Sequence, residues 1–309
     1  MQYTTFPKTD LKISKIALGT WVFSGGGTWG QFDEQDAIAA VHAAIDCGMT
    51  FIDTAPIYGY GQAERIVGTA LKGYREKVII ATKCGLLGRG KNIVNNLKPE
   101  SIERELHESL ERLQVDCIDI YQCHWPDPNT PVEEIMACLK KFQAQGKIKH
   151  IGVSNFDVGL MKQALTVAPV RTLQSPLSLL NRALQKDVLP FCQQHEIGVL
   201  AYGPLAGGIL SGKYKTPKTF AKSDARSFFY PYYQGERYKA VTGFLNDLAG
   251  LGRPLDQLAI NWVRQQPGVA GVLVGCRNPQ QVERNAAAAD WDLSGEQLRF
   301  IDERISRLS

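Results

Sequence analysis

The sequence of 309 residues lacks the features that define several large classes of protein. It contains no window of roughly 18 apolar residues, so we expect no transmembrane helix. The first residues carry no basic segment followed by an apolar run, which argues against a signal peptide. A net charge of +4, with no basic run interleaved with aromatics, argues against a nucleic-acid partner. We therefore expect a cytoplasmic protein with no nucleic-acid or membrane partner, as a monomer or weak oligomer.

Patterns typical of disulfide frameworks and metal sites are also missing. The seven cysteines are odd in number, irregularly spaced and free of any Cys-x-x-Cys pair. This favours reduced thiols over disulfides or a zinc site. The five histidines are scattered and form no His-x-x-x-His pair, so we expect no metal. The Gly-x-Ser-x-Gly motif of many hydrolases does not occur.

What the sequence does contain is an alternation of short β-branched runs with longer amphipathic segments. Eight runs resemble strands: Ile13–Leu18, Thr50–Thr54, Val78–Thr82, Cys117–Gln122, Lys149–Val153, Arg171–Gln174, Gly198–Tyr202 and Gly271–Val274. Most are followed by a helical pattern, which predicts a single (β/α)8 barrel domain over residues 1–309. An open doubly wound sheet is the alternative. Tyr3–Phe6 and Leu11–Ile13 predict an N-terminal β-hairpin that could plug the barrel and would move the first barrel strand towards Ile16.

Capping residues mark several of the predicted helices. The capped segments are Glu34–Asp46 after Asp33, Pro99–Leu113, Val132–Gln143 after Pro131 and Leu255–Arg264 after Pro254. Two long connections, Cys84 to Pro99 and Tyr202 to Pro254, each follow a predicted strand. In a barrel such connections lie at the C-terminal face, where active sites form.

Two glycine-rich segments match phosphate-binding motifs, and we reject both. Residues 25–30 fit the Gly-x-Gly-x-x-Gly pattern of a Rossmann fold, with Asp53 at a suitable distance. However, three residues separate the last glycine from the predicted helix, and the bulky Trp29 stands where the backbone must approach pyrophosphate. Residues 85–91 fit a P-loop, but Asn92 replaces the Ser or Thr that binds magnesium. A Rossmann dehydrogenase remains as an alternative.

Polar residues stand where the predicted strands end. They are Asp53 with Tyr58 in the following loop, Lys83, His124, Ser154 with Asn155, Gln174 and Tyr202. Taken singly, each has an ordinary structural explanation, such as a cap for Asp53 or a structural histidine for His124. Six strand ends of one kind are typical of the catalytic rim of a barrel.

Asp53, Tyr58, Lys83 and His124 also make chemical sense together. A free phenol has a pKa of about 10, and an adjacent ammonium favours phenolate, so we expect Lys83 to lower the pKa of Tyr58. Asp53 can hold Lys83 protonated, and His124 can orient or polarise a carbonyl oxygen. Such a set would donate a proton to an oxygen that develops negative charge. Carbonyl reduction also needs a hydride, for which a nicotinamide cofactor is the usual source.

At these positions the sequence resembles the aldo-keto reductase superfamily over essentially its whole length. The motifs are Ala17-Leu-Gly-Thr-Trp21, Phe51-Ile-Asp-Thr-Ala-Pro-Ile-Tyr58-Gly, Ala81-Thr-Lys83, His124-Trp-Pro-Asp127, Ile151-Gly-Val-Ser-Asn-Phe156, Tyr202-Gly-Pro-Leu-Ala-Gly-Gly-Ile-Leu-Ser-Gly-Lys213 and Val274-Gly-Cys-Arg-Asn-Pro-Gln-Gln281. The branch it most resembles is the bacterial one that includes general stress protein 69 and is related to potassium-channel β subunits. The resemblance implies a (β/α)8 barrel that binds NADPH or NADP+ without a Rossmann fold.

The resemblance also implies roles for individual residues. Asp53, Tyr58, Lys83 and His124 match the family's catalytic tetrad, with Tyr58 as general acid in reduction and base in oxidation. The positions that match cofactor contacts are Thr20 and Trp21; Ser154, Asn155 and Gln174 at the carboxamide; Tyr202 against the nicotinamide ring; Gly203, Leu205, Gly207, Lys213 and Arg226 at the pyrophosphate; and Gly275, Arg277, Gln281 and Asn285 at the adenosine end.

Some positions depart from the family pattern. Arg284 stands where many relatives carry Glu, and is either a second phosphate contact or a solvated helix residue. Gly275 stands where other branches place a Lys for the 2′-phosphate, a charge that Arg277 could supply, so we favour NADPH over NADH. The substrate mouth is expected to be formed by Trp21, Trp29 and Trp125. The aromatic run Phe228–Tyr233 could line that mouth or equally pack its loop against the barrel.

We therefore expect an NADPH-dependent oxidoreductase that reduces aldehydes or ketones to alcohols, with Tyr58 as general acid. Small reactive carbonyls such as methylglyoxal, or sugar-like aldehydes, are expected by analogy, and the oxidative direction remains open. The alternative is a redox sensor or regulatory binding protein in which cofactor occupancy is the signal and turnover is slow.

Overall fold

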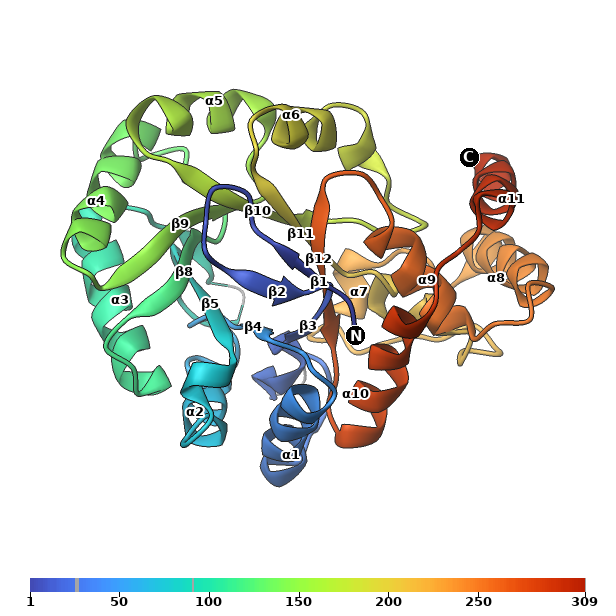
Figure 1. Cartoon of the computed structure of the whole chain (residues 1–309). Coiled ribbons are helices and arrows are strands. Elements are labelled where there is room, and N and C mark those ends of the chain that lie inside the picture. The colour runs from blue at the N-terminus through green and yellow to red at the C-terminus, as the bar shows by residue number, and fades with distance from the viewer. Residues whose placement is uncertain (26–27, 91, 309) are drawn as a thin grey trace.

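The computed structural model describes residues 1–25, 28–90 and 92–308, and the strands of this part of the chain form a closed parallel barrel (Figure 1). In order around the barrel the strands are β3 (Ile16–Gly19), β4 (Phe51–Asp53), β5 (Ile79–Cys84), β8 (Ile118–Cys123), β9 (Ile148–Ser154), β10 (Val170–Pro176), β11 (Gly198–Tyr202) and β12 (Val269–Gly275). The barrel closes where β12 pairs with β3, Val272 lying opposite Ile16. This confirms the predicted (β/α)8 fold and excludes the open doubly wound sheet.

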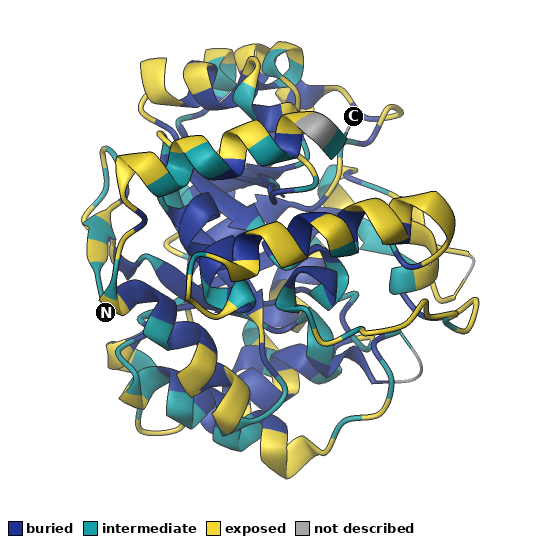
Figure 2. Cartoon of the chain, turned by 90° about the vertical axis from the view of Figure 1, so that its right-hand side faces the viewer, coloured by how far each residue is buried: buried dark blue, intermediate teal, exposed yellow. Residues whose placement is uncertain are grey.

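A helix follows each barrel strand and covers its outer face. These helices are α1 (Glu34–Asp46), α2 (Gln62–Ala70), α3 (Pro99–Leu113), α4 (Val132–Ala144), α5 (Val158–Val167), α6 (Val188–Gln194), α9 (Leu255–Arg264) and α10 (Pro279–Ala286). Figure 2 shows the buried strands at the centre and exposed residues on the outer faces of the helices. The Asp33 side chain accepts hydrogen bonds from the amides of Gln35 and Asp36, which confirms it as the cap of α1. Within the described residues, none of the helices is long and apolar enough to cross a membrane.

The two long connections contain structure of their own. The connection after β5 holds a small antiparallel pair, β6 (Leu86–Leu87) and β7 (Val94–Asn95). The connection after β11 holds α7 (Arg226–Phe229) and α8 (Gly235–Ala249), and α8 packs against the C-terminal helix α11 (Gly295–Ile305), at the right of Figure 1. Both connections reach the C-terminal face of the barrel, as predicted. The strands and helices inside them were not predicted from the sequence.

The opposite face is closed by the predicted N-terminal hairpin, β1 (Tyr3–Thr5) and β2 (Lys12–Ser14), which lies across the barrel in Figure 1. Phe6 follows β1 and is fully buried, with its ring edge-on to Phe51 at a centroid distance of 6.0 Å. Gly198, the first residue of β11, lies directly against Phe6. A Cβ at this position would lie 2.3 Å from the Phe6 ring, so only glycine fits there. The hairpin therefore completes the apolar lower half of the barrel core. The residues of this cluster are Phe6, Leu11, Ile13, Ala17, Phe51, Ala81, Ile120, Leu200 and Leu273.

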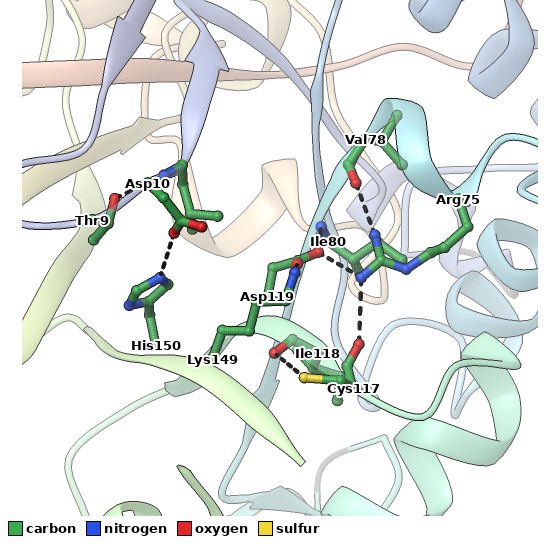
Figure 3. Close-up of polar contacts among 11 residues, drawn as sticks. Thr9, Asp10, Arg75, Val78, Ile80, Cys117, Ile118, Asp119, Lys149 and His150 are labelled. Carbon is green, nitrogen blue, oxygen red and sulfur yellow. Dashed lines mark hydrogen bonds and ion pairs between the residues drawn. The ribbon is translucent and has the colours of Figure 1, made fainter. Parts of the chain in front are cut away.

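A buried carboxylate joins three strands near this lower face (Figure 3). Asp119 of β8 accepts a hydrogen bond from the Ile80 amide at 2.9 Å. The same carboxylate pairs with Arg75 and with Lys149, each at 2.7 Å, while its own side chain is only 2% exposed. A buried carboxylate needs such partners to offset the cost of its desolvation. Asp119 thus holds β5, β8 and β9 together below the site.

We expect Asp119→Ala to destabilise the protein, because it removes the shared partner of two cations and one amide. The free energy of unfolding should fall by about 1–3 kcal/mol, the usual cost of leaving a buried donor such as the Ile80 amide without its acceptor, while the two cations are partly exposed and lose less. Chemical denaturation monitored by circular dichroism would measure the change. The matched control is Asp10→Ala, which removes an 85% exposed carboxylate that contacts His150 at 3.4 Å and should leave stability near that of the wild type. Equal losses in the two variants would contradict the bracing role of Asp119.

Candidate active site

A cleft of about 1840 Å³ opens at the C-terminal ends of the barrel strands. Its walls combine the strand ends with both long connections, which confirms the predicted location of the polar rim. Asp53, His124, Gln174 and Tyr202 line its floor, and Tyr58 reaches the same space from the loop after β4. The barrel interior therefore changes from apolar at the hairpin end to polar at the open end.

Lys83 is the charged centre of this floor. Its ammonium is fully buried and lies 2.7 Å from Asp53 Oδ2, 2.9 Å from the Thr54 carbonyl and 3.3 Å from the Tyr58 hydroxyl. The second oxygen of Asp53 accepts hydrogen bonds from Gln174 Nε2 at 2.7 Å and Gln122 Nε2 at 3.4 Å. Both members of the ion pair thus have the partners that a buried charge requires.

The pKa of the Tyr58 hydroxyl differs from the sequence-based prediction. Burial raises this pKa well above its ordinary value, and the nearby Asp53 carboxylate raises it further. The prediction that Lys83 lowers it is therefore wrong for this arrangement. Asp53, at 2.7 Å from Lys83, balances most of the ammonium charge, so desolvation of the phenolate decides the outcome. Tyr58 is consequently held as a neutral phenol, which is the form that can donate a proton.

His124 is held as a neutral imidazole beside this phenol. Its ring lies edge-on to Tyr58 with centroids 5.7 Å apart. Burial lowers the pKa of His124 well below its usual range, and the Lys83 charge lowers it further. A neutral imidazole can donate a hydrogen bond without adding a charge to the site. The pKa of Lys83 is also lowered by burial, although Asp53 opposes this shift.

A chain of polar side chains continues from His124 along the floor. Asn155 adopts a left-handed backbone conformation with φ of 60°. Its Nδ2 donates to the His124 carbonyl and to Ser154 Oγ, both at 3.0 Å. Its Oδ1 accepts from the Tyr202 hydroxyl, also at 3.0 Å. These contacts orient the amide group and the ring that border the deepest part of the cleft.

A glycine-rich turn after β11 forms the next part of the wall. Gly203, Gly207 and Gly208 all have positive φ, which lets the turn fold tightly beside the cleft. At Gly207 a Cβ would lie 2.8 Å from the Tyr230 ring, so no larger residue fits without displacing that ring. These three glycines line the cleft and have no side chains to project into it.

Cationic side chains surround the far end of the cleft. Arg226 pairs with Asp224 and donates to the Tyr214 hydroxyl at 2.9 Å. Arg277 donates to the Trp29 carbonyl, and burial lowers its pKa from the usual value. Lys213 lines the same region. Asp224 balances the charge of Arg226, so of these three cations Lys213 and Arg277 form no ion pair among the described residues and provide positive charge suited to phosphates.

Arg284 also lines the cleft, but its guanidinium is paired with the Asp256 carboxylate. This pairing neutralises much of its charge. The Arg284 side chain lies on α10 and is 59% exposed, which agrees with the solvated helix residue expected as one of the two alternatives from the sequence, while the pairing with Asp256 argues against a free phosphate contact.

The structure brings nearly all of the predicted site residues to this cleft. Those that line it are Trp21, Asp53, Tyr58, His124, Ser154, Asn155, Gln174, Tyr202, Gly203, Leu205, Gly207, Lys213, Arg226, Gly275, Arg277, Gln281 and Asn285. Lys83 lies beneath the floor, and Thr20 is fully buried behind it. Gly26, Gly27 and Lys91 of the two rejected phosphate motifs lie outside the described residues.

The aromatic run after Arg226 serves both of the purposes considered from the sequence. Tyr233 is buried and donates a hydrogen bond from its hydroxyl to the Gly207 carbonyl at 2.8 Å, so it packs the loop. Phe228 and Phe229 are exposed and line the cleft mouth. Phe229 contacts Trp21 edge-on at 5.5 Å, and Trp21 stacks on Tyr58 at 6.1 Å. Aromatic rings thus lead from the mouth to the phenol.

Sequence reasoning missed two polar residues near the charged centre. Gln122 points at Asp53 from β8, and strand alternation could have found it, because it lies two residues before His124. Glu105 of α3 accepts from the Gly85 amide just beyond β5, and no local pattern marks it.

Comparison with known proteins agrees with the fold and the motifs. The sequence profile of the Aldo/keto reductase family matches residues 15–305. The chain is 40% identical to aldo-keto reductase YhdN of Bacillus subtilis, over 98% of this chain and 93% of that protein. It is 34% identical to the NADH-specific methylglyoxal reductase of Escherichia coli, over 97% of each chain.

Solved structures show the same relationship. The glycerol dehydrogenase AKR11B4 from Gluconobacter oxydans superposes with a TM-score of 0.90 at 37% identity, covering 99% of this chain and 95% of that one. An aldo/keto reductase from Klebsiella pneumoniae in complex with NADP and acetate gives 0.75 at 31% identity, covering 98% and 95%. These similarities define a (β/α)8-barrel oxidoreductase. The chain belongs to the aldo/keto reductase family, as its motifs predict.

The family uses a nicotinamide cofactor, and the chemistry of the cleft fits such a group. Side-chain amides stand near the phenol, a turn with open backbone follows, and cations stand at the far end. The indole Nε1 of Trp29 is buried beside this space and finds no hydrogen-bond partner within the described part of the chain. The cleft therefore offers the kinds of group that suit a nicotinamide, its phosphates and its adenosine end.

We expect the Tyr58 hydroxyl to stay protonated up to a pH of about 10, because burial and Asp53 both oppose its ionisation. The ultraviolet difference spectrum of wild type against Tyr58→Phe would measure this, since all other tyrosines cancel. A phenolate signal in that difference near neutral pH would instead support the lowered pKa predicted from the sequence.

Proposed function

We propose that the protein is an NADPH-dependent reductase of aldehydes or ketones in which Tyr58 is the general acid. The observation that carries this proposal is the neutral phenol of Tyr58 at the cleft floor, 3.3 Å from the buried Lys83 ammonium. The phenol can supply a proton, and the ammonium can stabilise the phenolate that remains.

Each residue of the site has a separate role in carbonyl reduction. When bound, the reduced nicotinamide supplies the hydride for the carbonyl carbon. Tyr58 donates its proton to the carbonyl oxygen, which becomes the alcohol hydroxyl. Lys83 lies 3.3 Å from the phenolate oxygen so formed, and Asp53 keeps Lys83 in place at 2.7 Å. Neutral His124 donates a hydrogen bond to the carbonyl oxygen and so orients it towards the phenol.

The same geometry supports the reverse reaction. An alcohol hydroxyl placed beside Tyr58 would give its proton to the phenolate. Because burial makes that phenolate costly, oxidation should be favoured only as the pH rises.

We propose that the cleft residues hold the cofactor in the order of their positions. Ser154, Asn155 and Gln174 would hold the carboxamide, and Tyr202 would stack on the nicotinamide ring. Gly203, Leu205, Gly207, Lys213 and Arg226 would hold the pyrophosphate. Trp21, Gly275, Arg277, Gln281 and Asn285 would complete the site, with Thr20 supporting it from behind.

Preference for NADPH depends on the 2′-phosphate. Arg277 is the cation that we assign to this group, because Arg284 is already paired with Asp256. One relative is named as NADH-specific, so cofactor preference varies among similar proteins. The assignment to Arg277 therefore makes NADPH preference a property that a single substitution can test.

We propose uncharged carbonyl compounds as substrates, with small reactive aldehydes and sugar-like aldehydes among them. The substrate side of the cleft presents Trp21, Tyr60, Ile93, Trp125 and Phe229. The charged residues of the lining other than Asp53 belong to the far end: Lys213, Lys222, Arg226, Asp256, Arg277 and Arg284. An apolar mouth of this kind gives no compensation to a charged substrate group. Relatives named for methylglyoxal and glycerol act on small uncharged compounds.

We expect Tyr58→Phe to abolish most carbonyl reduction while cofactor binding is retained. The loss in kcat should be about 10²–10⁴-fold, the usual contribution of a general acid. NADPH consumption with a broad panel of aldehydes and fluorescence titration of NADPH would measure the two properties. Full activity in the variant would refute the role of Tyr58. Tight NADPH binding by the wild type without turnover on any aldehyde would instead favour the redox-sensor alternative.

We expect Arg277→Ala to weaken NADPH binding by about 10–100-fold, the equivalent of losing hydrogen bonds to a charged phosphate. NADH binding should change little, because NADH has no 2′-phosphate. The matched control is Arg284→Ala, which should have a smaller effect because Asp256 already pairs with that guanidinium. Parallel losses for both cofactors would show that Arg277 acts on the fold of the site rather than on the phosphate.

A further inference from the structure

A buried carboxylate outside the catalytic group stands at the end of β5. Glu105 of α3 is only 3% exposed. Both of its carboxylate oxygens accept the Gly85 amide hydrogen at 3.1 Å, and Ser101 Oγ lies 3.4 Å from one of them. Burying a carboxylate is costly, and one backbone amide with one hydroxyl is a small set of partners. The position of Gly85 in the chain indicates the role of this buried carboxylate.

Gly85 is the joint between β5 and the hairpin of β6 and β7. We use "mouth hairpin" for residues 85–90 and 92–97. The Gly85 carbonyl accepts from the Asn96 amide at 3.0 Å, which closes the base of the mouth hairpin. Gly85 has φ of 96°, and a Cβ there would lie 2.3 Å from Leu97. The backbone of this joint is therefore tightly confined, and Glu105 holds its amide from behind.

The mouth hairpin forms one wall of the cleft, through Leu86, Gly90, Ile93 and Asn95. It is fixed to its neighbours at its far base, where Asp127 accepts from the Leu97 amide at 2.9 Å. Asn95 Nδ2 donates to the Pro126 carbonyl at 2.8 Å. At the near base, Glu105 is the side chain that fixes Gly85. The Gly90 amide also donates to the Tyr60 hydroxyl at 2.9 Å, so loss of Glu105 would loosen the near base of the hairpin while its tip and its far base remained attached.

The same joint adjoins the catalytic strands. Gly85 is two residues beyond Lys83, and the intervening Cys84 accepts the His124 amide at its carbonyl, 2.9 Å away. A shift of Gly85 would therefore move the mouth hairpin directly. It would reach His124 only indirectly, through the hydrogen bond at the Cys84 carbonyl.

We propose that Glu105 is a positioning residue that fixes the mouth hairpin and so sets the affinity for substrates that reach this wall. This inference rests on the proposed carbonyl-reductase function. Glu105 does not touch the cleft, so its effect should be on KM for large substrates far more than on kcat or on cofactor affinity.

The protonation state of Glu105 gives the proposal a distinctive signature. Burial raises the pKa of Glu105 to about 8, against the lowering effects of the Gly85 amide, Ser101 and Arg104. Glu108 on the same helix raises it. From other elements, Cys84 of β5 and Tyr121 of β8 face the same carboxylate, and Glu64 of α2 acts on Tyr121. The carboxylate should thus hold Gly85 with two oxygens at high pH and with one after protonation.

The first test is hydrogen exchange of the mouth hairpin in wild type, Glu105→Gln and Glu105→Ala at about pH 7 and about pH 9. Glutamine keeps one acceptor oxygen and no charge, so it imitates the protonated acid. Wild type and Glu105→Gln should exchange alike at the lower pH. At the higher pH the wild-type hairpin should be protected more strongly, and Glu105→Ala should be the least protected at both.

The second test is KM at saturating cofactor for an aldehyde long enough to reach Ile93 and for a small aldehyde. At the higher pH we expect Glu105→Ala to raise KM for the long aldehyde about tenfold, the ratio that corresponds to one lost hydrogen bond to a charged group. KM for the small aldehyde and the Kd for NADPH should stay within about twofold. Groups that titrate in all variants cancel in this comparison.

The matched control is Glu64→Gln. Glu64 is also a buried carboxylate that braces β5, and it accepts hydrogen bonds from Thr82 Oγ1 and Arg112 Nε at 2.6 Å each. Neither of these partners belongs to the mouth hairpin. This variant should lose thermal stability without changing hairpin exchange or the ratio of the two KM values.

Identical hairpin exchange in wild type and Glu105→Ala would overturn the proposal. Equal effects of Glu64→Gln and Glu105→Gln on hairpin exchange at the higher pH would also overturn it. Hydrogen exchange needs no turnover, so it separates the two ideas. If no aldehyde is reduced by any form, the proposed function fails, and exchange still decides whether Glu105 holds the hairpin.

Discussion

The ion pair between Lys83 and Asp53 is the interaction on which the rest of the site depends. Burying an ammonium has a large desolvation cost, which only a close carboxylate can offset. Asp53 is that carboxylate, 2.7 Å from the Lys83 ammonium. Asp53 in turn is satisfied by Gln174 and Gln122, which project from other strands. The upper half of the barrel must therefore be polar and must keep its strands in register. Tyr58 and His124 remain neutral because burial disfavours their charged forms, and Asp53 raises the pKa of Tyr58 further while Lys83 lowers that of His124 further.

The two ends of the barrel meet opposite physical demands. At the lower end the hairpin and Phe6 fill the interior with apolar groups, and Asp119 places its charge outside that core. At the upper end the interior cannot be filled in the same way, because a ligand must enter. The long connections after β5 and β11 take over the task of enclosing it.

The sequence predicted those parts that are marked locally. The barrel strands were found because each is a short β-branched run, and α1, α3 and α9 were found because Asp33, Pro99 and Pro254 mark their starts. Helix α8 was missed because Gln234, the residue before it, is not of a type that marks a helix start, and β6 and β7 were missed because they are two residues each. The polar residues of the cleft floor were found because they end strands or follow them.

What could not be predicted depends on distances between elements. The raised pKa of Tyr58 follows from complete burial and from the proximity of Asp53 to Lys83, neither of which the sequence states. The pairing of Arg284 with Asp256 joins two helices that lie 28 residues apart in the chain. The seam of the barrel has a related consequence for folding. Because β3 pairs with β12, the first and last barrel strands, the core cannot close until nearly the whole chain has been synthesised. The apolar strands made earlier therefore stay partly exposed until β12 has been synthesised. Aggregation is consequently a greater risk for the nascent chain than for the folded protein.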